Sequence, residues 1–212
     1  MGYYPLFIEL DGKRCVVVGG GGVVERKVIG LLSAGAQVTV ISPRITRGLK
    51  TLVKNRAIHH IQRGFRGQDL DGVFLVIGAT SSKDTNLSVQ REASRRGILV
   101  NIVDSPEGSN FIVPGVVRRG RLVVAVSTSG MCPLLTATLR RRIEEMIPEG
   151  YGEFVELLGS IRQKLLKEGI KRGKKDKIIR NLIDSPMLEW IKQGAWDRVD
   201  EFIEEVLGET PP

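Results

Sequence analysis

The 212-residue sequence contains few of the residues that usually carry metal or redox chemistry. Its cysteines are Cys15 and Cys132, and its two histidines, His59 and His60, are adjacent. No CxxC pair occurs, so the spacing of a zinc site is missing. Two isolated cysteines also give no disulfide framework, which favours a reducing compartment. We therefore expect a cytoplasmic protein without a bound metal or a disulfide.

Long apolar runs and interleaved aromatic residues are scarce as well. No apolar stretch approaches the roughly 20 residues that span a bilayer, and the N-terminus lacks the charged start and cleavage site of a signal peptide. A net charge of +8 favours an anionic partner. Because aromatic residues make up 5% and no nucleic-acid motif is present, we expect neither nucleic acid nor a membrane as partner. The basic residues serve a polycarboxylate ligand or are solvated.

What the sequence does contain is a run of four glycines between a strand and a helix. Cys15–Val18 is a continuous apolar run, typical of a parallel strand that is covered on both faces. Gly19–Gly22 follow directly, and a helical pattern continues to Ala34. Glycines permit close backbone approach, and a helix N-terminus attracts phosphate. The sequence therefore predicts a pyrophosphate site that includes Gly19, Gly21, Gly22 and Val23.

This glycine stretch matches the dinucleotide fingerprint except at its third small position, which is Val24. A glycine turn in a protein without nucleotide is the alternative, but it explains four glycines poorly because each costs backbone entropy on folding. The expected acid after the second strand is also missing, since Ser42 stands there, followed by Pro43 and Arg44. An arginine in this loop admits NADP as the alternative to NAD.

Strand and helix patterns alternate through the first half of the chain. Further strands are expected at residues 37–42, 58–62, 73–77 and 99–103, with helices at 45–54 and from Thr85 to Gly97. This order predicts a Rossmann-like α/β fold with one parallel sheet. Small residues Ala79 and Thr80 end the fourth strand, where a cofactor would cross the carboxyl edge of the sheet.

The rhythm changes after Pro114. Val116–Val117 and Leu122–Val126 predict a hairpin joined by the basic turn Arg118–Arg121, and a helix from Leu134 to Met146 carries one apolar stripe. Helical patterns continue to about Leu207. We predict an NAD-binding domain at residues 1–112, a small α+β dimerisation segment at 113–148 and a helical C-terminal domain at 149–212.

Polar residues around the hairpin are candidates for binding substrate. Ser127 and Thr128 would hydrogen-bond a carboxylate or cap the helix that follows. Arginines bind carboxylates in a bidentate manner, which makes candidates of Arg118 and Arg119, with Arg121 and Arg140 as further ones. Each of these arginines is equally explained as a solvated side chain.

Several separated motifs occur in the order found in one known family. They are Gly19–Lys27, Gly78–Thr80 with Asn86, Asn101–Asp104, Phe111–Pro114, and Val126–Gly130 with Pro133. The chain thereby resembles the precorrin-2 dehydrogenase/sirohydrochlorin ferrochelatase family, which forms the N-terminal module of siroheme synthase. The resemblance covers essentially the whole sequence, and it implies the stand-alone form because the methyltransferase module is missing.

The resemblance implies NAD-dependent oxidation of precorrin-2, a tetrapyrrole, to sirohydrochlorin. It also implies a homodimer that exchanges residues 112–148, and insertion of ferrous iron as a second reaction in bifunctional members. Asp104 matches the family's catalytic aspartate, and Thr128 takes the place of a serine that is phosphorylated in a fusion-type member. Iron insertion requires a base for the pyrrole protons but no permanent metal site.

Chemistry alone also makes Asp104 a candidate. Removing a hydride from a ring carbon requires a base for the accompanying proton, and Asp104 follows a central strand at the predicted cofactor edge. The alternative is a turn aspartate before Ser-Pro. Two other functions stay open: a non-catalytic nucleotide-sensing domain, as in potassium transporters, and an NADP-dependent reductase that uses Arg44 and Arg47.

Overall fold

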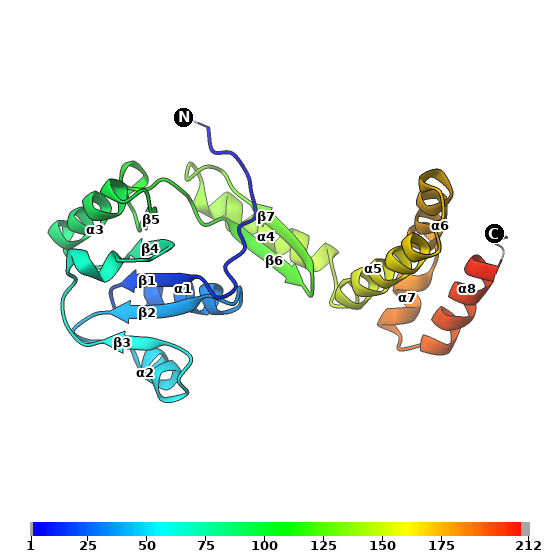
Figure 1. The fold of residues 1–212 in the computed structure, drawn as a ribbon, viewed down its shortest axis with the longest axis horizontal. Coiled ribbons are helices and arrows are strands. Elements are labelled where there is room, and N and C mark those ends of the chain that lie inside the picture. The colour runs from blue at the N-terminus through cyan, green and yellow to red at the C-terminus, as the bar shows by residue number, and fades with distance from the viewer. Residues whose placement is uncertain (1, 209–212) are drawn as a thin grey trace. The chain divides into compact units, whose positions relative to one another are not determined.

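The structure is a computed structural model that describes residues 2–208 (Figure 1). The chain divides between Val113 and Pro114 into two compact units. The predicted dimerisation segment at 113–148, except Val113, and the predicted helical domain at 149–212 both fall in the second unit. Residues 209–212 lie outside the described part.

A five-stranded parallel sheet forms the centre of the first unit. Its strands are β1 (Arg14–Val18), β2 (Gln37–Ile41), β3 (His59–Ile61), β4 (Leu75–Gly78) and β5 (Leu99–Ile102), in the order β3-β2-β1-β4-β5. This confirms the Rossmann-like fold. The predicted third strand, 58–62, is too long at both ends, because the ladder to β2 begins at His59 and ends at Ile61.

Helices cover both faces of this sheet, which explains the continuous apolar run in β1. Val17 packs with Val24 and Val28 of α1 (Gly22–Leu32) and Leu49 of α2 (Arg47–Lys54). Val16, which points the opposite way, packs on the face covered by α3 (Lys83–Arg95) and the short helix η1 (Gly67–Leu70). Alternate residues of one strand therefore belong to two separate cores.

The second unit begins with an antiparallel hairpin of β6 (Gly115–Arg119) and β7 (Leu122–Val126). The prediction placed Arg118 and Arg119 in the turn, which was wrong. Both lie in β6, paired with Val123 and Leu122, because Gly120 at φ 53° permits a tight two-residue turn.

Five helices follow the hairpin in the described part of the second unit (Figure 1). They are α4 (Pro133–Met146), α5 (Tyr151–Lys167), α6 (Arg172–Asp184), α7 (Met187–Lys192) and α8 (Trp196–Gly208). Helices α5 to α8 share one apolar core, centred on Leu165, Leu182 and Met187. Across residues 2–208, no helix has both the length and the apolar character to cross a membrane.

Candidate functional site

The carboxyl ends of the five strands form one continuous edge in the first unit. Four backbone hydrogen bonds continue the ladder just past the strands: Ser42 N–H to Ile61 O, Gly19 N–H to Ile41 O, Ala79 N–H to Val18 O and Val103 N–H to Gly78 O, at 2.8–3.2 Å. The glycine turn, the Ala79–Thr80 loop and Asp104 therefore begin side by side along this edge. The order of the strands reverses between β1 and β4, because β2 and β3 lie on one side of β1 whereas β4 and β5 lie on the other. Nucleotide sites of this fold are found at such a switch point.

The glycine turn has a packed half and an open half. A Cβ on Gly19, which has φ 128°, would overlap Ala79 O, and a Cβ on Gly20 would overlap Arg44 O. Gly21 and Gly22 have nothing within 4 Å of such an atom and are exposed. Gly21 is the residue before α1, and Val23 in its first turn is also exposed. An open glycine surface at a helix N-terminus fits a dinucleotide pyrophosphate.

Thr46, which the sequence analysis gave no function, fixes this turn against α2. Its N–H donates to Gly20 O at 3.0 Å, its hydroxyl donates to the Glu25 carboxylate of α1, and the same oxygen accepts the Leu49 N–H as the N-cap of α2. The helix was predicted to begin at residue 45, but α2 begins at Arg47, and the available signal for its start was the threonine itself. The link to Glu25, 21 residues away, requires the fold.

Ser42, at the position where an acid was expected, faces inward. Its hydroxyl donates to Arg44 O at 2.7 Å, and His60 Nε2 lies 2.9 Å from Ser42 O. Pro43 and Arg44 are exposed beside it. A cavity of about 390 Å³ adjoins this loop and is lined by Pro43, Arg44, Ile45, Lys50, Val53, His60 and Gln62. Its basic side chains are available to an anion.

The loop after β4 is held by Asn86. The Asn86 Oδ1 atom accepts from both the N–H and the hydroxyl of Thr80, at 3.2 and 2.8 Å, and its Nδ2 donates to Thr80 O at 3.0 Å. The predicted cofactor residues Ala79 and Thr80 therefore have a fixed backbone at the sheet edge. Asn86 therefore positions Thr80. In the sequence, Asn86 was recognised only as part of the family motif, and no function was predicted for it.

Asp104 lies immediately after β5 in a tight turn. Its φ is 61°, the left-handed region, and the turn is closed by Ser105 N–H donating to Ile102 O at 3.1 Å. The side chain is exposed, and its carboxylate has no hydrogen-bond or ion-pair partner within residues 2–208. A carboxylate held in an uncommon backbone conformation without an internal partner is available to act on a ligand.

In the second unit, the predicted substrate hydroxyls serve the loop before α4. The Thr128 hydroxyl accepts from Cys132 N–H at 3.0 Å and lies 3.0 Å from the Thr136 hydroxyl. Ser127 Oγ accepts from Ser129 N–H, and Ser129 is left-handed at φ 53°. The hydrogen bonds from Cys132 N–H and Ser129 N–H lie within the loop and do not cap α4, because its N-cap is Cys132, whose own side chain makes no capping hydrogen bond. Ser127 is more exposed than Thr128.

Arg118 and Arg119 of β6, both predicted to bind substrate, differ in their surroundings. The Arg119 guanidinium donates to Ile147 O, Glu144 O and Arg118 O and lies 3.3 Å from Glu149, with its side chain 11% exposed. Arg118 is exposed, and its guanidinium has no such contact with any of residues 2–208. Of the pair, Arg118 is the one whose guanidinium is available to a carboxylate ligand.

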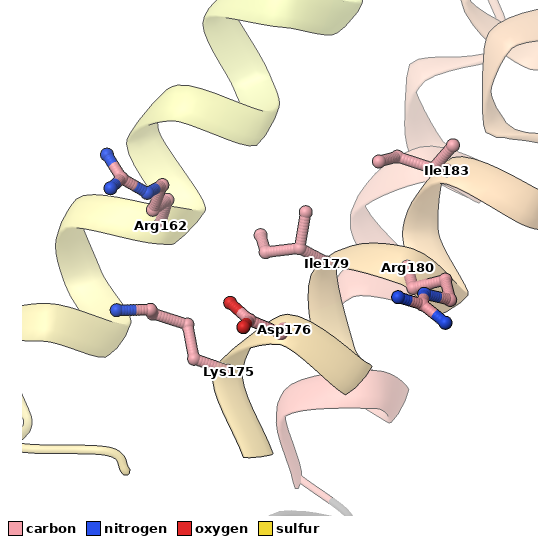
Figure 2. Close-up of a pocket in the computed structure, with 6 residues that line it drawn as sticks. All are labelled: Arg162, Lys175, Asp176, Ile179, Arg180 and Ile183. Atoms are coloured by element: carbon pink, nitrogen blue, oxygen red, sulfur yellow. The ribbon is translucent and has the colours of Figure 1, made fainter. Parts of the chain in front are cut away.

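Other chemistry is limited in the described residues. A cavity of about 250 Å³ between α5 and α6 is lined by Arg162, Lys175, Asp176, Ile179, Arg180 and Ile183. Figure 2 shows these six side chains, none of which was predicted as a site residue. No group of three potential metal ligands is found among residues 2–208. Burial raises the pKa of the Cys15 thiol to about 11, so this cysteine stays protonated and unreactive.

Comparisons with known proteins agree with this arrangement. Residues 6–115 match the family described as "Putative NAD(P)-binding", and residues 119–146 match "Sirohaem biosynthesis protein central". The siroheme synthases of Thioalkalivibrio sulfidiphilus and Methylobacillus flagellatus are 39% and 38% identical over 98% and 96% of this chain. The chain spans 42% and 44% of their lengths.

A solved structure, "SirC, precorrin-2 dehydrogenase", matches with a TM-score of 0.78 and 25% identity, over 97% of this chain and 100% of the other. The match extends over both units and is therefore not limited to a common nucleotide-binding sheet. The chain belongs to the family described as "Putative NAD(P)-binding", and its similarity to sirohaem biosynthesis proteins confirms the resemblance that its sequence motifs predicted.

Proposed function

We propose that this chain oxidises precorrin-2 to sirohydrochlorin with NAD as the electron acceptor. The observation that carries the proposal is the free carboxylate of Asp104, held in a left-handed turn on the same sheet edge as the open glycine turn. A sensing domain would have no use for an unpartnered base at this position. The relationship to siroheme synthases and SirC supports the substrate class.

Each group in the first unit has a distinct part in the proposed reaction. Gly21, Gly22 and the N-terminus of α1 would hold the pyrophosphate, and the Ala79–Thr80 backbone would support the cofactor where it crosses the sheet edge. When bound, the nicotinamide supplies the hydride acceptor. Asp104 accepts the proton that leaves the substrate, so that two electrons and two protons are removed from the ring in total, one proton travelling with the hydride.

The Asp104→Asn variant tests this function. It keeps the shape of the side chain and tolerates the left-handed turn, but it cannot accept a proton. We expect turnover of precorrin-2 to fall about 10²-fold or more, while the affinity for NAD stays constant, because Asp104 lies outside the glycine turn. The measurement is an absorbance time course with precorrin-2 and NAD.

Asp84→Asn is the matched control, since Asp84 is an exposed acid in the first turn of α3. It should leave turnover unchanged. A folded Asp104→Asn protein that works at the wild-type rate would remove Asp104 from the mechanism. We propose insertion of ferrous iron into sirohydrochlorin as a second reaction, and adding ferrous iron to the same assay tests it. The Asp104→Asn variant should lose this reaction too, because the pyrrole protons also need a base.

We propose NAD as the cofactor, with NADP as the alternative. Ser42 is a neutral residue at the position where an acid usually binds the ribose of NAD. The observation that favours NADP is the cavity lined by Arg44, Lys50 and His60, whose basic side chains would bind a 2′-phosphate. Parallel calorimetric titrations with NAD and NADP decide between them. Tighter binding of NADP, lost in Arg44→Ala, would reverse the assignment.

We also propose a homodimer, in which the apolar face of α4 meets a second copy. None of the 14 residues of α4 is buried, and Leu134, Leu135 and Met146 are 79%, 47% and 76% exposed. Large apolar side chains gathered on one element favour a protein partner.

We propose that the Arg118 guanidinium binds a carboxylate of the substrate. We propose that the Ser127 and Thr128 hydroxyls also bind a substrate carboxylate, through the hydrogen bonds that they do not already make within the loop. A cytoplasmic location stays a prediction from the sequence.

A further inference from the structure

The segment after Asp104 replaces a missing strand beside β5. Asn110 N–H donates to Val100 O at 2.9 Å, its side-chain Oδ1 accepts from Val100 N–H at 2.8 Å, and its Nδ2 donates to Ile98 O at 3.1 Å. Asn101 Nδ2 in turn donates to Phe111 O at 3.0 Å. The outer edge of β5 is thereby satisfied largely by side chains rather than by a sixth strand.

Ser109 belongs to this segment and contacts both ends of the Asp104 turn. Its hydroxyl oxygen accepts a hydrogen bond from the N–H of Ile102, the last residue of β5, at 2.9 Å. The same hydroxyl donates to Ser105 O, also at 2.9 Å. The turn residues Val103 and Asp104 lie between these two points. One hydroxyl group therefore connects the residue before the turn with the residue after it.

The backbone around this hydroxyl has little freedom to move. Asp104 is left-handed, a conformation that residues other than glycine adopt rarely. The short helix η2 (Pro106–Gly108) follows, and a Cβ on Gly108 would lie 3.0 Å from Ser105 Oγ and 3.3 Å from Ile102 Cγ1. The close packing keeps Ser109 within reach of the turn.

We infer that Ser109 is a positioning residue, whose hydroxyl holds the turn in the geometry that directs the Asp104 carboxylate. The inference rests on the proposed function of Asp104 and extends it to a residue with no contact to the carboxylate itself. Without the hydroxyl, Ile102 N–H and Ser105 O lose their shared partner, and the turn relaxes. A misdirected base slows proton removal while the cofactor and substrate still bind.

Two variants of equal shape isolate the hydroxyl. Ser109 has an extended backbone, φ −123° and ψ 140°, which suits β-branched side chains. Ser109→Thr keeps the hydroxyl, and Ser109→Val replaces it with a methyl group. We expect Ser109→Val to lower kcat about tenfold with KM and NAD affinity unchanged, and Ser109→Thr to retain most of the wild-type kcat. If Ser109→Val does not fold, Ser109→Ala takes its place.

A double-mutant cycle with Asp104→Asn completes the test. If Ser109 acts through Asp104, Ser109→Val should cost no further activity in the Asp104→Asn background. Equal losses in the Val and Thr variants, an undiminished kcat in Ser109→Val, or a loss that persists without Asp104 would each overturn the inference. Full activity of Asp104→Asn alone would instead overturn the proposed function, so the two failures are distinguishable.

Discussion

Single glycines in the turn between β1 and α1 have different functions, although they are adjacent. Gly20 has no room for a side chain, because its Cβ would overlap Arg44 O and lie 2.7 Å from Ser42 Oγ. Gly21 has open space and φ −87°, a conformation that any residue adopts. Packing therefore requires a glycine at position 20, whereas the proposed binding of the pyrophosphate requires the glycine at position 21.

Substitutions at these two positions should separate stability from binding. We expect Gly20→Ala to lower the free energy of unfolding by about 1–3 kcal/mol. Gly21→Asp should keep the melting temperature but weaken NAD binding strongly, because its carboxylate would face the pyrophosphate. Thermal melts and calorimetry measure the two effects. Gly64→Asp, in a similarly open loop position, is the control. A folded Gly21→Asp protein with unchanged NAD affinity would show that the site is misassigned.

At the scale of elements, Arg119 connects the β6–β7 hairpin to the end of α4. Its guanidinium donates to the carbonyl oxygens of Glu144, in the last turn of that helix, and of Ile147, the C-cap residue after it. Backbone acceptors at a helix C-terminus lack helical partners. A cation is also favourable at a helix C-terminus. The side chain that the sequence presented as a substrate ligand thus holds two elements together in the second unit.

Neighbouring arginines therefore give a matched pair of variants. We expect Arg119→Ala to lower the free energy of unfolding by about 2 kcal/mol, since it removes several hydrogen bonds of a charged group. Arg118→Ala should leave stability unchanged and raise the KM for precorrin-2. Denaturant unfolding and steady-state kinetics separate the two. A raised KM in Arg119→Ala without any loss of stability would assign the substrate to Arg119 instead.

At the scale of the whole molecule, the exposed face of α4 predicts association. Light scattering at micromolar concentration should give a mass twice the 23.4 kDa of one chain. Leu135→Glu should shift the mass towards the monomer, because a charge would have to be buried in the interface, whereas Leu166→Glu, at an exposed position on α5, should not. A monomeric wild-type protein would contradict the proposed dimer.

The sequence by itself determined the nucleotide-binding sheet and the glycine turn. These follow from local patterns: a continuous apolar run followed by glycines and a helical period predicts a strand covered on both faces, and β1 confirms it with Val16 and Val17 in separate cores. The position of Asp104 after the fifth strand followed from the same order of elements. Boundaries were less well predicted, as Arg118 and Arg119 in β6 show.

Only the tertiary structure decided which polar side chains are free to bind a ligand. Thr46 donates to Glu25, Asn86 binds Thr80, and Ser109 contacts both ends of the Asp104 turn. The periodicity of apolar residues in the sequence predicts none of these hydrogen bonds. Such contacts depend on backbone direction in turns and on residues brought together from separate elements. A sequence pattern records which residues are buried, but the partner of a hydroxyl or an amide is fixed only when the chain has folded.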